Sequence, residues 1–135
     1  MIDILLNRKK ITMQILTLFL VALVALEHIG IAGLEMFAKP EQQASAFDMP
    51  LGFVKTKEAH TALSNQGIYN GMLGILILMM ILFFTGSTLK IILIMLMIYI
   101  IVVAVYGALT ATKKILYLQG LPALVSLLFV IFFYK

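Results

Sequence analysis

Residues 61–89 read TALSNQGIYNGMLGILILMMILFFTGSTL and contain no charged side chain. About 20 apolar residues are enough to carry an α-helix across the hydrocarbon layer of a membrane. Other uncharged stretches lie on both sides of this one, at 11–26, 91–112 and 115–134. The sequence therefore predicts an all-α integral membrane protein with four spans.

The composition favours the same class of protein. Of the 135 residues, 63% are hydrophobic and 12% are charged, whereas soluble domains have about 45–50% apolar and about 25% charged residues. The net charge is only +4, without a dense basic face, so we expect membrane lipids as partners and no nucleic acid. The chain has no cysteine, which excludes disulfides, a thiolate nucleophile and Cys-ligated metal sites.

We predict a single transmembrane domain over residues 1–135, with spans at about 11–37, 61–85, 89–111 and 115–134. Short connections force neighbouring spans to be antiparallel, which gives a four-helix bundle in up-down-up-down order. Residues 38–60 are predicted to form a polar loop at the membrane interface.

The N-terminal residues also resemble a secretory signal peptide, because Arg8-Lys9-Lys10 precedes an apolar run. No small-x-small cleavage site follows, so we expect uncleaved insertion as a multi-pass protein of the cell membrane. Five Lys or Arg side chains fall on each face of the predicted bundle, so their distribution does not decide the orientation. The basic cluster beside the first span favours termini on the inside.

Polar side chains gather at one end of the predicted bundle, where the first span ends, the second begins, the third ends and the fourth begins. Ionisable groups inside spans are costly and usually face protein or a water-filled cavity. We therefore predict a one-sided polar pocket. Its candidate acid–base residues are Glu27, His28 and Glu35, and its candidate substrate-binding residues are Asn65, Gln66, Tyr69, Asn70, Tyr106 and Gln119.

Other interpretations of these residues stay open. The ionisable groups could simply hydrogen-bond neighbouring helices, the amides could cap helix ends, and Tyr99 and Tyr106 are equally typical of core packing. A metal site is disfavoured, because His28 and Glu35 lie about 10 Å apart along a helix axis at about 1.5 Å per residue. We expect no metal and no cofactor.

Four sequence blocks resemble one known family in order along the chain. They are Ala25-Leu-Glu-His-Ile with Leu34-Glu-Met-Phe, Asn65-Gln-Gly-Ile-Tyr-Asn-Gly, Tyr106-Gly-Ala-Leu-Thr, and Gln119-Gly-Leu-Pro-Ala. They are similar to the signature blocks of the small four-helix membrane proteins called domain of unknown function 1304. The likeness covers roughly Met13 to Phe133. It implies the fold and the choice of site residues, but no reaction or substrate.

Three functions are compatible with this pattern. The preferred one is a pocket that binds a small apolar or lipid-like molecule, with acid–base chemistry by the Glu and His residues. The second is a small proton-coupled exporter or channel that works as a homodimer. The third is a structural membrane subunit whose GxxxG face, Gly67 and Gly71, binds a partner helix.

Overall fold

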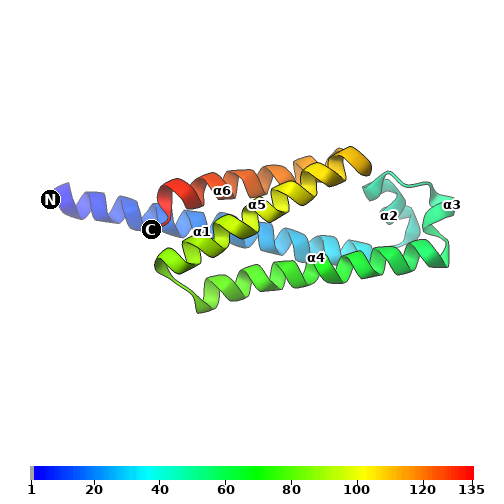
Figure 1. Ribbon diagram of the computed structural model, residues 1–135, viewed down its shortest axis with the longest axis horizontal. Helices are drawn as coiled ribbons and strands as arrows, with labels where there is room; N and C mark the ends of the chain where they lie inside the picture. The colour runs from blue at the N-terminus through cyan, green and yellow to red at the C-terminus, as the bar shows by residue number, and fades with distance from the viewer. Residues whose placement is uncertain (1) are drawn as a thin grey trace.

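The computed structural model describes residues 2–135 as a set of helices joined by short connections (Figure 1). The long helices are α1 (Ile2–Phe37), α4 (Lys57–Phe83), α5 (Gly86–Thr110) and α6 (Leu121–Phe133). The shorter ones are α2 (Pro40–Phe47), α3 (Leu51–Val54) and a π-helix, η1 (Leu116–Gly120), which leads directly into α6. Four segments, the last of them η1 with α6, are long and apolar enough to cross a membrane. The predicted all-α class and four-helix bundle are confirmed.

Consecutive long helices run in opposite directions along the long axis of the molecule (Figure 1). The start of α1 extends beyond the other helices, and α2 and α3 lie at the opposite end. That the chain crosses a bilayer back and forth in this order stays a prediction, as does the single transmembrane domain.

The helix ends follow local chemistry. The chain has no Gly or Pro before Gly30, so α1 begins at Ile2, earlier than the predicted span. Lys39 is extended, with φ −65° and ψ 149°, as expected for a residue before proline, and Pro40 starts α2. The polar segment predicted as a loop thus contains two short helices.

The closest helix pair is α1 with α4, which also make the most extensive contact in the bundle. A Cβ built on Gly74 would lie 2.4 Å from the carbonyl oxygen of Ala25, and one on Gly71 would lie 3.2 Å from the Cβ of Ala32. Small residues let two helix backbones approach closely, which strengthens van der Waals packing where lipid supplies no hydrophobic drive. The GxxxG face therefore packs inside the chain.

Several polar side chains are buried in the bundle, beside an apolar core that includes Val21, Ile77 and Leu93. The buried set includes the polar residues Thr17, His28, Glu35, Gln43, Thr112, Gln119 and Ser126. Large apolar side chains cover the outside, with Leu82 75% exposed and Leu109 81% exposed. A contiguous apolar exterior of this kind is rare on soluble monomers and is suited to contact with lipid.

An ionic contact ties the α2–α3 segment to the connection between α5 and η1. Asp48 ends α2 in the left-handed region, with φ 53°, which aspartate tolerates better than most residues. Lys114 Nζ donates to Asp48 Oδ1 at 2.6 Å and to the Ser45 carbonyl oxygen at 2.8 Å. Thr112 Oγ1 also donates to the Asp48 carboxylate. These donors, Lys114 first, hold the pKa of Asp48 below its usual value.

The glycine contacts predict unequal effects of adding a methyl group. Gly74→Ala should lower the free energy of unfolding by about 1–3 kcal/mol, because a backbone carbonyl of α1 blocks the new Cβ. Gly67→Ala should also destabilise the bundle, since its Cβ would lie 2.4 Å from the Met36 Cγ and 3.2 Å from the Ala32 carbonyl oxygen, and Met36 can move aside only by changing its rotamer. Gly30→Ala is the control. Nothing lies within 4 Å of its added Cβ, so it should raise stability by roughly 0.5–1 kcal/mol. Thermal unfolding in nanodiscs, followed by circular dichroism, measures all three, and equal losses would contradict the packing.

The Asp48 contact predicts a dependence on pH. A carboxyl group with a lowered pKa in the folded state stabilises the fold above its unfolded-state pKa, and the effect is lost as pH falls through the folded value. At pH 7, Asp48→Asn should therefore speed hydrogen–deuterium exchange in residues 40–56 a few-fold. Parent and variant should converge only well below pH 3.8, the ordinary value for Asp48, once pH has fallen through the lowered pKa of the folded state. Glu58→Gln on α4 is the control, and a difference that persists at low pH would refute the ionic contact.

Candidate functional site

Glu35 and Asn70 form the polar contact between α1 and α4. Asn70 Nδ2 donates to Glu35 Oε2 at 2.8 Å, and Glu35 is only 3% exposed. The approach depends on Gly67, because a Cβ there would lie 3.2 Å from the Glu35 Cβ. A hydrogen bond away from water is strong and costly to break. The pair therefore fixes the orientation of the Glu35 carboxyl group.

The end of α1 beside this pair is capped by α2. Gln43 is buried, and its Nε2 donates to the carbonyl oxygens of Leu34 at 3.2 Å and Glu35 at 2.9 Å. The last carbonyl groups of a helix have no partner within the helix, so this side chain supplies one. Gln43 thus holds the backbone of Glu35 from the polar end of the bundle.

His28 lies deeper in α1 and is 2% exposed. Its Nδ1 is 2.8 Å from the carbonyl oxygen of Val24. A carbonyl oxygen can only accept, so Nδ1 carries the hydrogen and Nε2 of the neutral ring carries the lone pair. The ring is therefore held in one tautomer, with Nε2 available as an acceptor.

The π-helix η1 brings a glutamine into the interior. The N–H of Leu121 donates to the carbonyl oxygen of Leu116, five residues earlier, which is the π-helical pattern. Such insertions are rare and occur often at functional sites. Gln119 and Gly120 are buried within η1, and a Cβ on Gly120 would lie 3.3 Å from that of Ala104 on α5. The close contact with α5 seats Gln119 inside the bundle.

A cavity of about 210 Å³, the first cavity, lies between these groups. It is bordered by α1, α4, α5 and η1. Its apolar lining includes Leu73, Ile100 and Val103. Its polar lining is His28, Gln66, Tyr69, Asn70, Tyr99 and Gln119.

A second cavity, of about 160 Å³, adjoins the first, because both are lined by Gln66, Asn70, Val103 and Gln119. It lies toward the α2–α3 end. There it is covered by Phe47 and Met49, which belong to the segment that the Asp48–Lys114 contact holds against the connection between α5 and η1. Polar side chains that line only this cavity are Glu35 and Thr112. The two cavities together form a polar interior that extends along the bundle.

The structure thus brings together most, but not all, of the residues predicted from the sequence. Asn65 and Tyr106 are exposed and line neither cavity. Tyr69 is 71% exposed but borders the first cavity. Glu27 lines neither cavity, and its buried Oε1 has no hydrogen-bond partner among the described residues.

Three polar contributors were not among the predicted site residues: Tyr99, Gln43 and Thr112, of which Thr112 lines the second cavity. Tyr99 lines the first cavity. The sequence places Tyr99 on the same helical stripe as Val103, and this could have pointed to the site. The same pattern is equally typical of core packing. Gln43 lies in the polar segment outside the spans, and no local pattern marks it. Within the described part of the chain, no group of three or more His, Cys, Asp or Glu side chains could hold a metal ion.

Comparison with known proteins places the chain among sequences without an assigned function. The profile of the family described as "Protein of unknown function (DUF1304)" matches residues 22–131. The chain is also 43% identical over 117 residues to "Uncharacterized protein YpaA" of Lactococcus lactis subsp. lactis (strain IL1403). That alignment covers 86% of this chain and 97% of the relative. No solved structure gives a significant match.

The family match spans the glycine face of α4, the Glu35–Asn70 pair and the π-helix. It agrees with the resemblance carried by the four sequence blocks. The protein therefore belongs to the domain of unknown function 1304 family.

Proposed function

We propose that this chain is a multi-pass protein of the cell membrane that binds a small apolar or lipid-like molecule in its two polar cavities. The observation that carries the proposal is the pair of adjoining cavities, lined by amide, imidazole and phenol groups inside a bundle with an apolar exterior. Polar groups in a membrane interior cost free energy unless they interact with other polar groups. The polar part of a bound ligand would supply such interactions.

The distribution of polar and apolar groups supports access from one side. The interior toward the α4–α5 turn is mainly apolar, with Ile77, Leu89, Leu93 and Met97 buried there. The buried hydroxyl of Thr17 at this end donates to the Met13 carbonyl oxygen within α1. A transporter needs a site that opens to both faces of the membrane. This asymmetry favours a binding pocket over a proton-coupled exporter or channel that acts as a homodimer.

The glycine packing bears on the alternative of a structural subunit. Gly67 and Gly74 are buried against α1 of the same chain, so this face is not free to receive a helix from a partner. A purely structural role would also not explain why polar side chains line the two cavities. We therefore favour the binding function.

For the chemical step we assign His28 as the proton acceptor, because its Nδ1–H is engaged by Val24 and its Nε2 keeps a lone pair. Glu35, oriented by Asn70, is the second acid–base group. Gln66 and Gln119 would hold the polar end of the ligand. Glu27 lines neither cavity and takes no contact with the ligand in this assignment.

The proposal predicts that a small molecule copurifies with the protein and depends on the cavity residues. Native mass spectrometry with lipid extraction should find it on the parent. A His28→Ala, Gln119→Ala double variant should lose at least about tenfold in occupancy, which is about 1.4 kcal/mol of binding. If the protein also converts this molecule chemically, the His28→Gln variant should copurify with the unconverted molecule.

The matched control is an Asn65→Ala, Tyr106→Phe double variant, since both residues are exposed and lie outside the cavities. It should keep the molecule. Gln66→Ala, on an exposed residue at the cavity border, tests the same site without disturbing buried packing. Equal occupancy in all folded variants, or an empty parent, would overturn the proposed function.

A further inference from the structure

An open apolar groove between α4 and α5 adjoins the first cavity. It has a volume of about 440 Å³ and is lined by Met72, Leu73, Leu76, Leu96 and Tyr99. We call it the α4–α5 groove. Leu73 and Tyr99 also line the first cavity, so the groove and the cavity adjoin each other at these two side chains.

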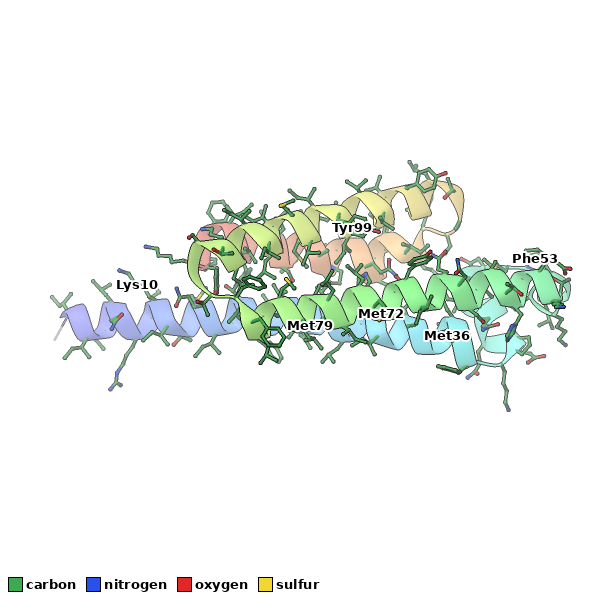
Figure 2. All side chains as sticks on the ribbon, turned by 60° about the horizontal axis from the view of Figure 1, so that its bottom comes forward. Lys10, Met36, Phe53, Met72, Met79 and Tyr99 are labelled. Carbon is green, nitrogen blue, oxygen red and sulfur yellow. The ribbon has the colours of Figure 1, made fainter. Side chains whose placement is uncertain are left out.

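The groove is available from the outside of the bundle. Met72 is 52% exposed, and Tyr99 is 55% exposed. These two residues lie on the adjacent helices α4 and α5 (Figure 2), which contact each other much less than α1 contacts α4. A molecule in the surrounding lipid could therefore enter sideways, with its apolar part in the groove.

The polar groups at the inner end of this path are suited to a positive charge. None of the residues that line the two cavities and the groove is Lys or Arg. An anionic head would therefore be buried with no opposite charge in either cavity, whereas a cationic head in the first cavity lies beside the second cavity, which the Glu35 carboxyl group lines. Lys113 and Lys114 each lie next in sequence to a residue that lines the second cavity. Both are exposed and outside the lining, and the Nζ of Lys114 is engaged by Asp48 and Ser45.

An ammonium group, by contrast, would find several partners. The rings of Tyr69 and Tyr99 border the first cavity, and aromatic faces attract cations. The Nε2 of His28 and the amide oxygens of Gln66 and Gln119 are hydrogen-bond acceptors, and an ammonium group supplies only donors. The carboxyl group of Glu35 lines the adjoining second cavity.

We propose that the ligand is a single-chain amphiphile with an ammonium head, bound with its head in the first cavity and its chain in the α4–α5 groove. This inference rests on the proposed binding function and names the class of molecule that the site takes. The chain takes the groove because the groove adjoins the cavity at Leu73 and Tyr99. The tyrosine pair and the Glu35 carboxyl group of the adjoining second cavity, with no Lys or Arg in the lining, set the charge of the head.

Photoaffinity labelling in nanodiscs tests this inference. The probes are a dodecylamine, a dodecanol and a dodecyl phosphate, each with the same diazirine in the middle of the chain. The amine should label peptides that contain Met72–Leu76 and Leu96–Tyr99, and excess unlabelled dodecylamine should abolish the labelling. The alcohol and the phosphate should label these peptides at least tenfold less.

Three variants locate the two parts of the ligand. Leu76→Trp should fill the groove and remove labelling by the amine, whereas Ile91→Trp, on an exposed position of α5 outside the groove, should not. Tyr69→Leu removes one aromatic face from an exposed residue and should weaken labelling by the amine roughly threefold or more, without an effect on folding.

The outcomes separate this inference from the function on which it rests. If the alcohol or the phosphate labels the same peptides as strongly as the amine, the ammonium head is refuted while binding in the cavity stands. If every probe labels lipid-facing helices evenly, and Leu76→Trp changes nothing, both the inference and the proposed pocket fail. Preference for the amine that is lost in Leu76→Trp supports both.

Discussion

The rest of the structure depends on the close approach of α1 and α4 at glycine. Gly67, Gly71 and Gly74 give α4 a face without side chains, and α1 packs directly against it. This approach lets Asn70 reach Glu35 and turns His28 toward the space between α4 and α5. Because α4 packs closely along α1, it contacts α5 much less. The cavities and the groove lie where these two helices diverge, so close packing on one side creates the open site on the other.

Much of this arrangement follows from the sequence. Long uncharged stretches predicted the helices, since only helices satisfy their own backbone in an apolar medium. The spacing of Gln66 and Asn70 predicted that they share a face of α4, and both line the two cavities. The Gly67–Gly71 pair predicted close packing of a helix, but its spacing alone did not say whether that helix is in the same chain. The contact with Ala32 answers this for the structure.

Other features depend on contacts that no local pattern encodes. Gln43 reaches the end of α1 only because α2 folds back over it. The π-helix η1 forms directly before α6, whose second residue is Pro122. Asn65 and Tyr106 illustrate the opposite failure, because they are polar residues at the predicted end of the bundle that point away from the cavities. Asn65 falls to one side of the helical stripe that Gln66 and Asn70 share, so its sequence signal is the weaker one. Tyr106, by contrast, shares a stripe with Tyr99 and Val103, which line the first cavity. Rotation of each helix about its axis, which depends on packing, decides between inside and outside.

The most direct test of this account is a designed disulfide between α1 and α4. The chain contains no cysteine, so an Ala32→Cys, Gly71→Cys variant has a clean background. The two Cβ positions are 3.2 Å apart, within a few tenths of an ångström of the range of about 3.5–4.5 Å found in disulfides. The account predicts rapid oxidation to a cross-link within one chain, seen as a monomer on non-reducing gels. Cross-linked dimers, or two free thiols, would contradict it.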